Sequence, residues 1–266
     1  MAQDAPKDRI TIVELPQISV VDKLLSIEQS LAAVKKRTTE EAWADDYNRL
    51  YNRFRRDGTL SKVTGEGKDN VYLALALGIK ASDAIVALKA RNVETLKASA
   101  DQVEALARQL GVTDAELAMT ASVRRYAEDR KWFDAFMALG RLQRNVLAYL
   151  RDPRNEGKLP LASLVIIGGW MQGGRCVTAV VDEEYSAYVS NVLREGRLVT
   201  LLKNYVEERL PPNILNHPAV QELVAKFPEI HRRVDIGFED AVSQEDVRWL
   251  HQVFDQLVRD VLPEPN

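Results

Sequence analysis

The chain has 266 residues, of which 46% are hydrophobic and 28% charged, an ordinary composition for a globular protein with a packed core. Its 36 basic and 39 acidic side chains leave a net charge of -3, which argues against a partner such as bulk nucleic acid, whose binding depends on phosphate contacts. The single cysteine, Cys176, excludes an intrachain disulfide and lies in an apolar stretch, where a reactive thiolate is disfavoured.

The first residues, from Met1 to Lys7, are mostly small and polar and contain no apolar signal-peptide core. Such residues often follow a signal-peptide cleavage site, so we expect an exported, periplasmic protein whose signal has been removed, with a cytoplasmic location as the alternative. Residues 1–16 are predicted to form an extended arm, because Ile10 to Leu15 alternate loosely in polarity before Pro16.

Two helices that form a hairpin are predicted between residues 20 and 58. The second is opened by a capping box, Thr38 with Glu41, and stops at Gly58. Basic and aromatic side chains interleave in this second helix, but its aromatic residues share one face, so the arginines are expected to be solvated rather than to bind nucleic acid or anionic lipid. The glycines of the following loop lack the spacing of a phosphate-binding loop.

Helices are predicted next at residues 71–90 and 93–110, the second closed by Gly111. Thr113 and Glu116 form another capping box. The helical region that this box opens is predicted to continue through the apolar residues Val123, Tyr126, Trp132, Phe133, Phe136, Leu139, Val146 and Leu150.

A short similarity links two of these regions. Ala76, Leu77 and Gly78 recur as Ala138, Leu139 and Gly140, with further apolar residues at the same offset. A true duplication would give two related helical hairpins, each presenting one glycine to a neighbouring helix, whereas chance similarity between buried helices is the alternative.

The apolar stretch from Leu161 to Val181 is the most unusual segment, because it contains Gly168, Gly169, Gly173 and Gly174. A glycine inside a helix costs roughly 0.5 to 1 kcal/mol relative to alanine, so something must approach this backbone closely. The polar residues within the stretch argue against a membrane span and favour a helix buried in a bundle. One smooth face of that helix is formed by Val165, Gly169, Gly173, Cys176 and Val180.

Three interpretations of this helix remain open: close packing against another helix, a cavity for an apolar ligand or partner segment, and a hinge. Gln172 and Arg175 are expected to point outward or to pair with an acidic neighbour, because an unpaired buried charge is costly. The candidate ligand-binding residues are Gly169, Trp170, Gln172, Gly173, Arg175 and Cys176.

After this helix, a long helical region is predicted from Glu183 to Arg209, ended by Pro211. The acidic residues 182–184 are attributed to its N-terminal start rather than to a metal site. Pro218 is predicted in the first turn of the next helix, Pro228 at the start of another, and Ser243 at the cap of the last.

No motif in the chain points to a metal, a cofactor or a reaction class. His217, His231 and His251 lack zinc, di-iron or haem spacing. The chain also has no nucleophile elbow and no alternation of strands and helices typical of a dinucleotide-binding sheet. We therefore expect no metal and no cofactor.

The predicted fold is an all-α antiparallel bundle of about eight to ten helices, with residues 17–264 as one domain and a subdivision at 152–160 as the alternative. The predicted function is a non-enzymatic binding role beside the helix at 161–181, for a protein partner or an apolar small ligand. Two alternatives are an enzyme that uses Gln172, Arg175 and one histidine, and a purely structural or oligomerising bundle.

Overall fold

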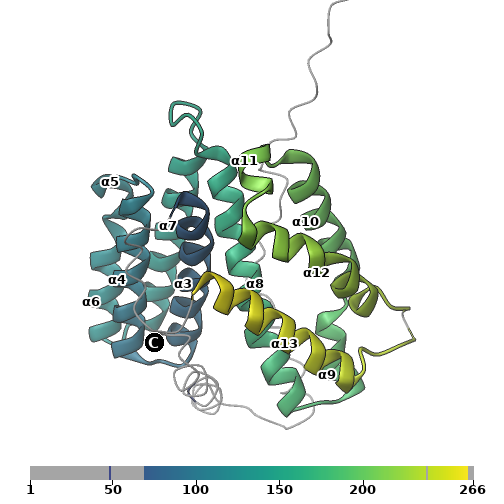
Figure 1. Ribbon diagram of the computed structural model, residues 1–266. Helices are drawn as coiled ribbons and strands as arrows, with labels where there is room; N and C mark the ends of the chain where they lie inside the picture. The colour runs from purple at the N-terminus through teal and green to yellow at the C-terminus, as the bar shows by residue number, and fades with distance from the viewer. Residues whose placement is uncertain (1–47, 49–68, 238, 263–266) are drawn as a thin grey trace, which may run out of the picture.

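The computed structural model describes residue 48, residues 69–237 and residues 239–262, and within these residues the protein consists of helices and connecting turns without a strand (Figure 1). The predicted all-α fold is therefore confirmed. The extended arm at 1–16, the hairpin between 20 and 58 and the loop up to residue 68 lie outside the described residues.

The first group of described helices packs side by side on the left of Figure 1. Asp69 caps the first of them, since its side chain accepts hydrogen bonds from the amides of Val71 and Tyr72. These helices are α3 (Asn70–Lys89), α4 (Val93–Gln109), α5 (Asp114–Leu117), α6 (Met119–Glu128) and α7 (Trp132–Arg151). A loop then leads to α8 (Leu159–Glu183), which runs through the middle of the molecule.

The second group follows α8 and covers its other side, where α13 packs directly against it. Its elements are α9 (Ala187–Ser190), the 3-10 helix η2 (Asn191–Leu193), α10 (Gly196–Arg209), α11 (Pro212–Leu215), α12 (Pro218–Val234) and α13 (Gln244–Val261). Ser243 caps α13 as predicted, because its hydroxyl accepts a hydrogen bond from the amide of Asp246. One hydrophobic core contains residues from both groups, on either side of the subdivision considered at 152–160.

The helical region predicted after Thr113 is divided into α5, α6 and α7, because the chain turns twice within it, first at Ala118. Thr113 does precede α5, but its hydroxyl contacts the Glu116 side chain and makes no backbone capping bond. The second turn falls at Arg130, which has a φ of 54°. The amide of Lys131 bonds the Tyr126 carbonyl there, the arrangement that usually has glycine at the left-handed position. With arginine in that place, the sequence carries no stop signal.

Two further boundaries differ from the predictions. The helix expected to begin at Glu183 begins at Gly196, and residues 182–184 stand at the C-terminal end of α8, where Asp182 pairs with Arg248 of α13. Pro228 lies inside α12 instead of opening a new helix. Phe227 and Ile230, on either side of Pro228, are buried and pack α12 against the core. The helix therefore continues although proline has no amide hydrogen to donate.

The centre of the molecule is formed by α3 and α8, both buried along most of their length. Each is long and apolar enough to cross a membrane by length and composition alone, yet 83% and 89% of their apolar windows are buried inside the protein. Core helices of globular proteins satisfy the same criteria, and the burial of α8 agrees with the prediction of a bundle helix.

Candidate functional site

Two glycines of α8, Gly168 and Gly174, lie where another helix approaches its backbone closely. A Cβ atom added to Gly168 would come 2.1 Å from the Leu75 carbonyl oxygen, and one added to Gly78 would come 2.0 Å from the Val165 carbonyl oxygen. Farther along α8, a Cβ on Gly174 would meet the ring of Phe254 at 2.6 Å. The absence of side chains at these positions is therefore what allows the helices to approach, in agreement with the close-packing interpretation.

A buried polar cluster follows the glycine contact along both helices. The amide nitrogen of Gln172 donates to Asp83 Oδ1 at 2.6 Å, and Lys80 Nζ donates to Asp83 Oδ2 at 3.1 Å. Lys80 and Asp83 are 1% and 3% exposed. Burial raises the pKa of Asp83, against the opposing influence of Lys80, Gln172 and Arg175. This cluster therefore places a charged pair in the most apolar part of the molecule.

Arg175 extends the cluster to α13, where it forms an ion pair with Asp255. Its side chain is only 1% exposed. Of the two arrangements predicted for Gln172 and Arg175, the structure shows the second, because both pair with an acidic side chain and neither points outward. Their partners lie far away in the sequence, on α3 and α13, because each buried polar group must be satisfied by whatever helix packs against it.

His251 of α13 approaches the same part of α8, with its Nδ1 atom 3.2 Å from Thr178 Oγ1 and 3.2 Å from the Arg175 carbonyl oxygen. His217 caps α12, and its Nε2 atom lies 2.9 Å from Asp69 Oδ2. The Nε2 atom of His231 lies 3.5 Å from Asp235 Oδ2 on the protein surface. Among the described residues, no group of three histidine, cysteine or acidic side chains could hold a metal ion.

The six predicted ligand-binding residues belong to the interior. Trp170 packs between Phe227, at 6.1 Å between ring centroids, and Phe254, at 5.0 Å. Cys176 and Gly173 are buried, and burial raises the pKa of the Cys176 thiol, which keeps it unreactive. Only Gly169 is partly exposed, and its carbonyl accepts a hydrogen bond from Ser82. The binding role assigned to these residues stays a prediction.

An exposed apolar surface lies elsewhere, on the first turns of α7. Phe133, Phe136 and Met137 are 73%, 37% and 40% exposed. Because residues three and four apart adjoin on a helix, they form one surface, which we call the α7 patch. They make up three of the six large apolar side chains that are exposed among the described residues. The prediction that counted Phe133 and Phe136 among the apolar residues of one helical region gave no sign of this exposure.

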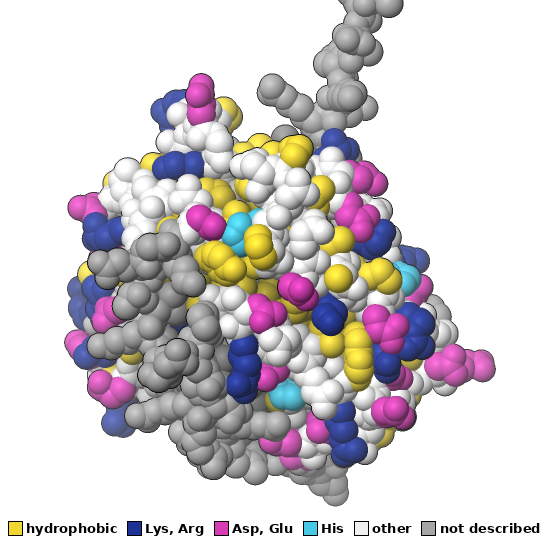
Figure 2. All heavy atoms as spheres, in the orientation of Figure 1, with side chains coloured by type: hydrophobic (Ala, Val, Ile, Leu, Met, Phe, Trp, Pro, Cys, Tyr) yellow, Lys and Arg dark blue, Asp and Glu magenta, His cyan; other side chains and the backbone are white. Residues whose placement is uncertain are grey.

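Two arginines share this side of α7. Arg141 and Arg144 follow Met137 by one and two helical turns and are exposed. Neither forms an ion pair with another described residue. In contrast, basic and acidic side chains adjoin on the face formed by α12 and α13 (Figure 2), where Arg233 pairs with Glu229 and Asp246.

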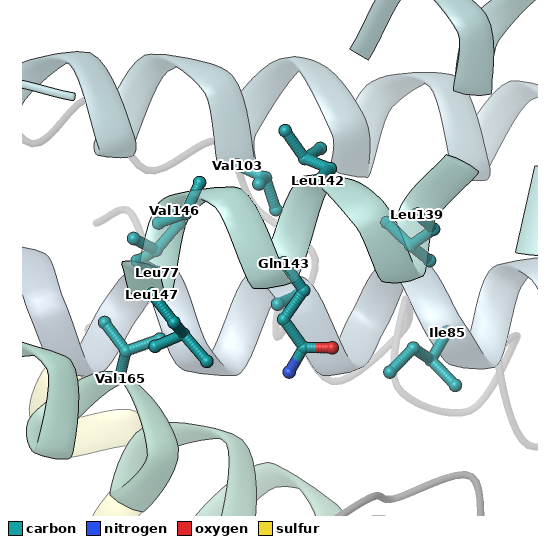
Figure 3. Close-up of a pocket in the computed structure, with 10 residues that line it drawn as sticks. Leu77, Ile85, Val103, Leu139, Leu142, Gln143, Val146, Leu147 and Val165 are labelled. Atoms are coloured by element: carbon teal, nitrogen blue, oxygen red, sulfur yellow. The ribbon is translucent and has the colours of Figure 1, made fainter. Parts of the chain in front are cut away.

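An apolar cavity of about 20 Å³ lies beneath α7, against α3, α4 and α8 (Figure 3). Leu139, one turn after Phe136, lines it, and the exposed Gln143 places its edge near the surface. Val165 contributes the wall from the glycine-containing helix. The lining is formed by Leu77, Ala81, Ile85, Val103, Leu139, Leu142, Gln143, Val146, Leu147 and Val165.

Sequence reasoning missed the partners of the buried cluster and the whole α7 patch. One signal was available for the cluster: Lys80 and Asp83, three residues apart, interrupt an otherwise apolar helix. No comparable signal exists for the patch, since exposed and buried phenylalanines are identical in sequence.

Comparison with known proteins adds no family to this description. No protein-family model, no curated protein and no solved structure matches the chain. The function is therefore inferred from the residues and their arrangement alone.

Proposed function

We propose that the protein is a non-enzymatic binding protein that engages a protein partner through the α7 patch. The observation that carries this proposal is the exposure of Phe133, Phe136 and Met137 side by side on one helix. Single exposed apolar side chains are normal on protein surfaces, but adjacent aromatic and methionine side chains are enriched at binding surfaces.

The size of the neighbouring cavity favours a protein partner over a free apolar molecule. A volume of about 20 Å³ is close to that of one water-sized probe. Pockets that enclose small ligands usually measure roughly 300 to 1,000 Å³. The α7 patch, in contrast, offers the kind of helical surface on which another amphipathic segment packs.

The unpaired charges beside the patch indicate the chemistry of that segment. Arg141 and Arg144 lie next to the apolar side chains without an acidic partner among the described residues. A partner segment with an apolar stripe and flanking carboxylates would pair with both arginines and cover the α7 patch. We therefore propose an acidic amphipathic segment as the partner.

The two alternative functions have weaker support. An enzyme built from Gln172, Arg175 and His251 would need a substrate to reach groups that are enclosed between α3, α8 and α13. An oligomerising bundle could use the same α7 patch to bind a second copy of the chain, so the two binding hypotheses differ in what covers the patch.

Photo-crosslinking from position 137 tests the proposal. A benzoylphenylalanine replacing Met137 should yield a discrete crosslinked complex with another protein in cells, and the same group replacing the exposed Tyr188 of α9 should not. A crosslinked species of twice the mass of the chain would instead establish self-association. Equal crosslinking from both positions would contradict the proposal.

A matched pair of surface variants then tests the residues. The Phe133→Ser/Phe136→Ser variant should lose the crosslink while still unfolding cooperatively, with a loss of stability of about 1 to 2 kcal/mol that comes mainly from the partly covered Phe136. The control Tyr188→Ser/Leu201→Ser removes two exposed apolar side chains from other elements and should retain the crosslink. Retention by both variants would overturn the assignment to α7.

A further inference from the structure

The last residue of α7, Arg151, carries a guanidinium edge without an acceptor. Its Nε and Nη2 atoms are both buried, and neither has a hydrogen-bond partner among the described residues. A buried charged donor that lacks an acceptor loses its hydration without compensation, which is why such groups are rare in folded proteins. Two N–H donors of Arg151 are therefore available to an acceptor that the described residues do not supply.

The same edge binds carboxylates elsewhere in this protein. In Arg232 it holds both oxygens of Glu229, with Nε to Oε2 at 3.0 Å and Nη2 to Oε1 at 2.5 Å. In Arg154, three residues after Arg151, it contacts the Asp152 carboxylate, with Nε to Oδ2 at 3.0 Å. Parallel donors on a planar guanidinium match the two oxygens of a carboxylate, and no described residue occupies this fork in Arg151.

A second donor lies beside the fork. Ser163 of α8 donates to the hydroxyl oxygen of Tyr205 of α10 at 2.7 Å, which leaves the Tyr205 hydrogen available to another acceptor. Arg209, one turn after Tyr205, is exposed and forms no ion pair with a described residue. Burial raises the pKa of Tyr205, although Ser163, Arg151 and Arg209 oppose that rise.

The surroundings of the fork are positive. Burial lowers the pKa of Arg151, and the only described titratable group that offsets this is Tyr205. No carboxylate of the described residues contributes. The site thus combines two fork donors and a hydroxyl donor with the additional charge of Arg209.

We propose that Arg151 and Tyr205 form a binding site for a small carboxylate-bearing ligand, between the end of α7, α8 and α10. Arg151 Nε and Nη2 donate to the two carboxylate oxygens, and the Tyr205 hydroxyl donates to one of them. Arg151 as a whole is partly exposed, and the proposal requires a small change in its side-chain torsions that opens the fork to the ligand while the fork stays beside Tyr205. The site lies about 27 Å along α7 from Phe133, and it is independent of the α7 patch.

Acetate is the simplest probe of this site. In 15N-labelled protein, at constant ionic strength with acetate replacing chloride, the Nε–H signal of Arg151 should shift and reach saturation. The Nε–H signal of Arg154 is the internal control, because Asp152 already occupies its fork and no saturable shift is expected. Arg154→Met should leave the titration of Arg151 unchanged.

Substitutions then assign the donors. Arg151→Met should abolish the saturable response to acetate, and Tyr205→Phe should weaken binding about two- to tenfold, the effect of one hydrogen bond. If Arg151→Met does not fold, the comparison of the two arginine signals in the wild-type protein decides. Parallel shifts of Arg151 and Arg154, no shift of Arg151, or tighter binding of phosphate than of acetate would each overturn the proposal.

Discussion

α3 and α7 are both 20-residue helices and both contain the tripeptide Ala-Leu-Gly, but they use it differently. In α3, Gly78 touches the backbone of α8. In α7, Gly140 is only partly buried, and the nearest atom to an added Cβ would be Arg144 Nη1 at 3.6 Å. A true duplication would have each glycine face a neighbouring helix, and Gly140 does not do so. The same local sequence is a packing device in one helix and a surface feature in the other.

Substitution of each glycine by alanine should give the largest difference in stability between the two helices. Gly78→Ala should cost about 3 kcal/mol or more, or prevent folding, because its Cβ would overlap the backbone of α8 and no flexible side chain can move aside. Gly140→Ala should instead stabilise the protein by about 0.5 to 1 kcal/mol through helix propensity. Urea unfolding of the two variants measures both effects. Equal losses would show that Gly140 is as enclosed as Gly78.

A buried ion pair and an exposed ion pair should also differ in their contribution to stability. Asp255→Asn removes the carboxylate that pairs with the buried Arg175, and with Arg259 of the same helix, and should lower the free energy of unfolding by about 1 to 3 kcal/mol. The matched control is Asp101→Asn, which breaks an exposed pair with Arg124 and should cost about 1 kcal/mol or less. Urea midpoints again provide the measurement, and a larger loss for Asp101→Asn would reverse the comparison.

The smallest effect is the opposite pH dependence of an interior and a surface carboxyl group. Hydrogen bonds from Arg232 lower the pKa of Glu229 from 4.5 to about 2, so its folded-state stabilisation is present above pH 4.5 and is lost toward pH 2. The raised pKa of Asp83 has the opposite sign, because ionisation costs more in the folded state and stability falls as the pH rises above 3.8.

Carboxyl-carbon NMR titration of the folded protein measures both groups directly. Glu229 should titrate near pH 2 and Asp83 above 3.8. In Glu229→Gln, the stability should depend less on pH between 2 and 4.5 than in the wild-type protein. Titration of Asp83 below 3.8 would mean that Lys80 and Gln172 outweigh the effect of burial.

Several elements were predictable because their signals are local. The stripe and closing glycine of the helix predicted at 93–110 match α4, and Ser243 caps α13 as expected. The turns at Arg91, Gly111 and Arg130 are alike, because each has one residue in the left-handed conformation. Only Gly111 is of the residue type that usually marks such a turn in a sequence. Helix ends that use arginine at this position leave no mark in the sequence.

The candidate sites were much less predictable. The sequence indicated that something approaches the α8 backbone. It did not indicate that α3 is the helix that does so, or that Gly78 of α3 and Gly168 of α8 both lie at this contact. It also placed Gln172 and Arg175 in the site without their partners Asp83 and Asp255. The bond between Gln172 and Asp83 joins residues 89 positions apart, and no spacing rule connects them.

By itself, the sequence determined the all-α class, most helix positions and the need for close packing at the α8 glycines. These follow from periodicity, capping residues and the cost of glycine in a helix, all of which act within a few residues. Only the tertiary structure decided which apolar surfaces are covered, which charges meet and which donors, such as Arg151 Nε, lack an acceptor among the described residues. Coverage and pairing depend on helices that are distant in sequence, so they are set by packing rather than by local preference.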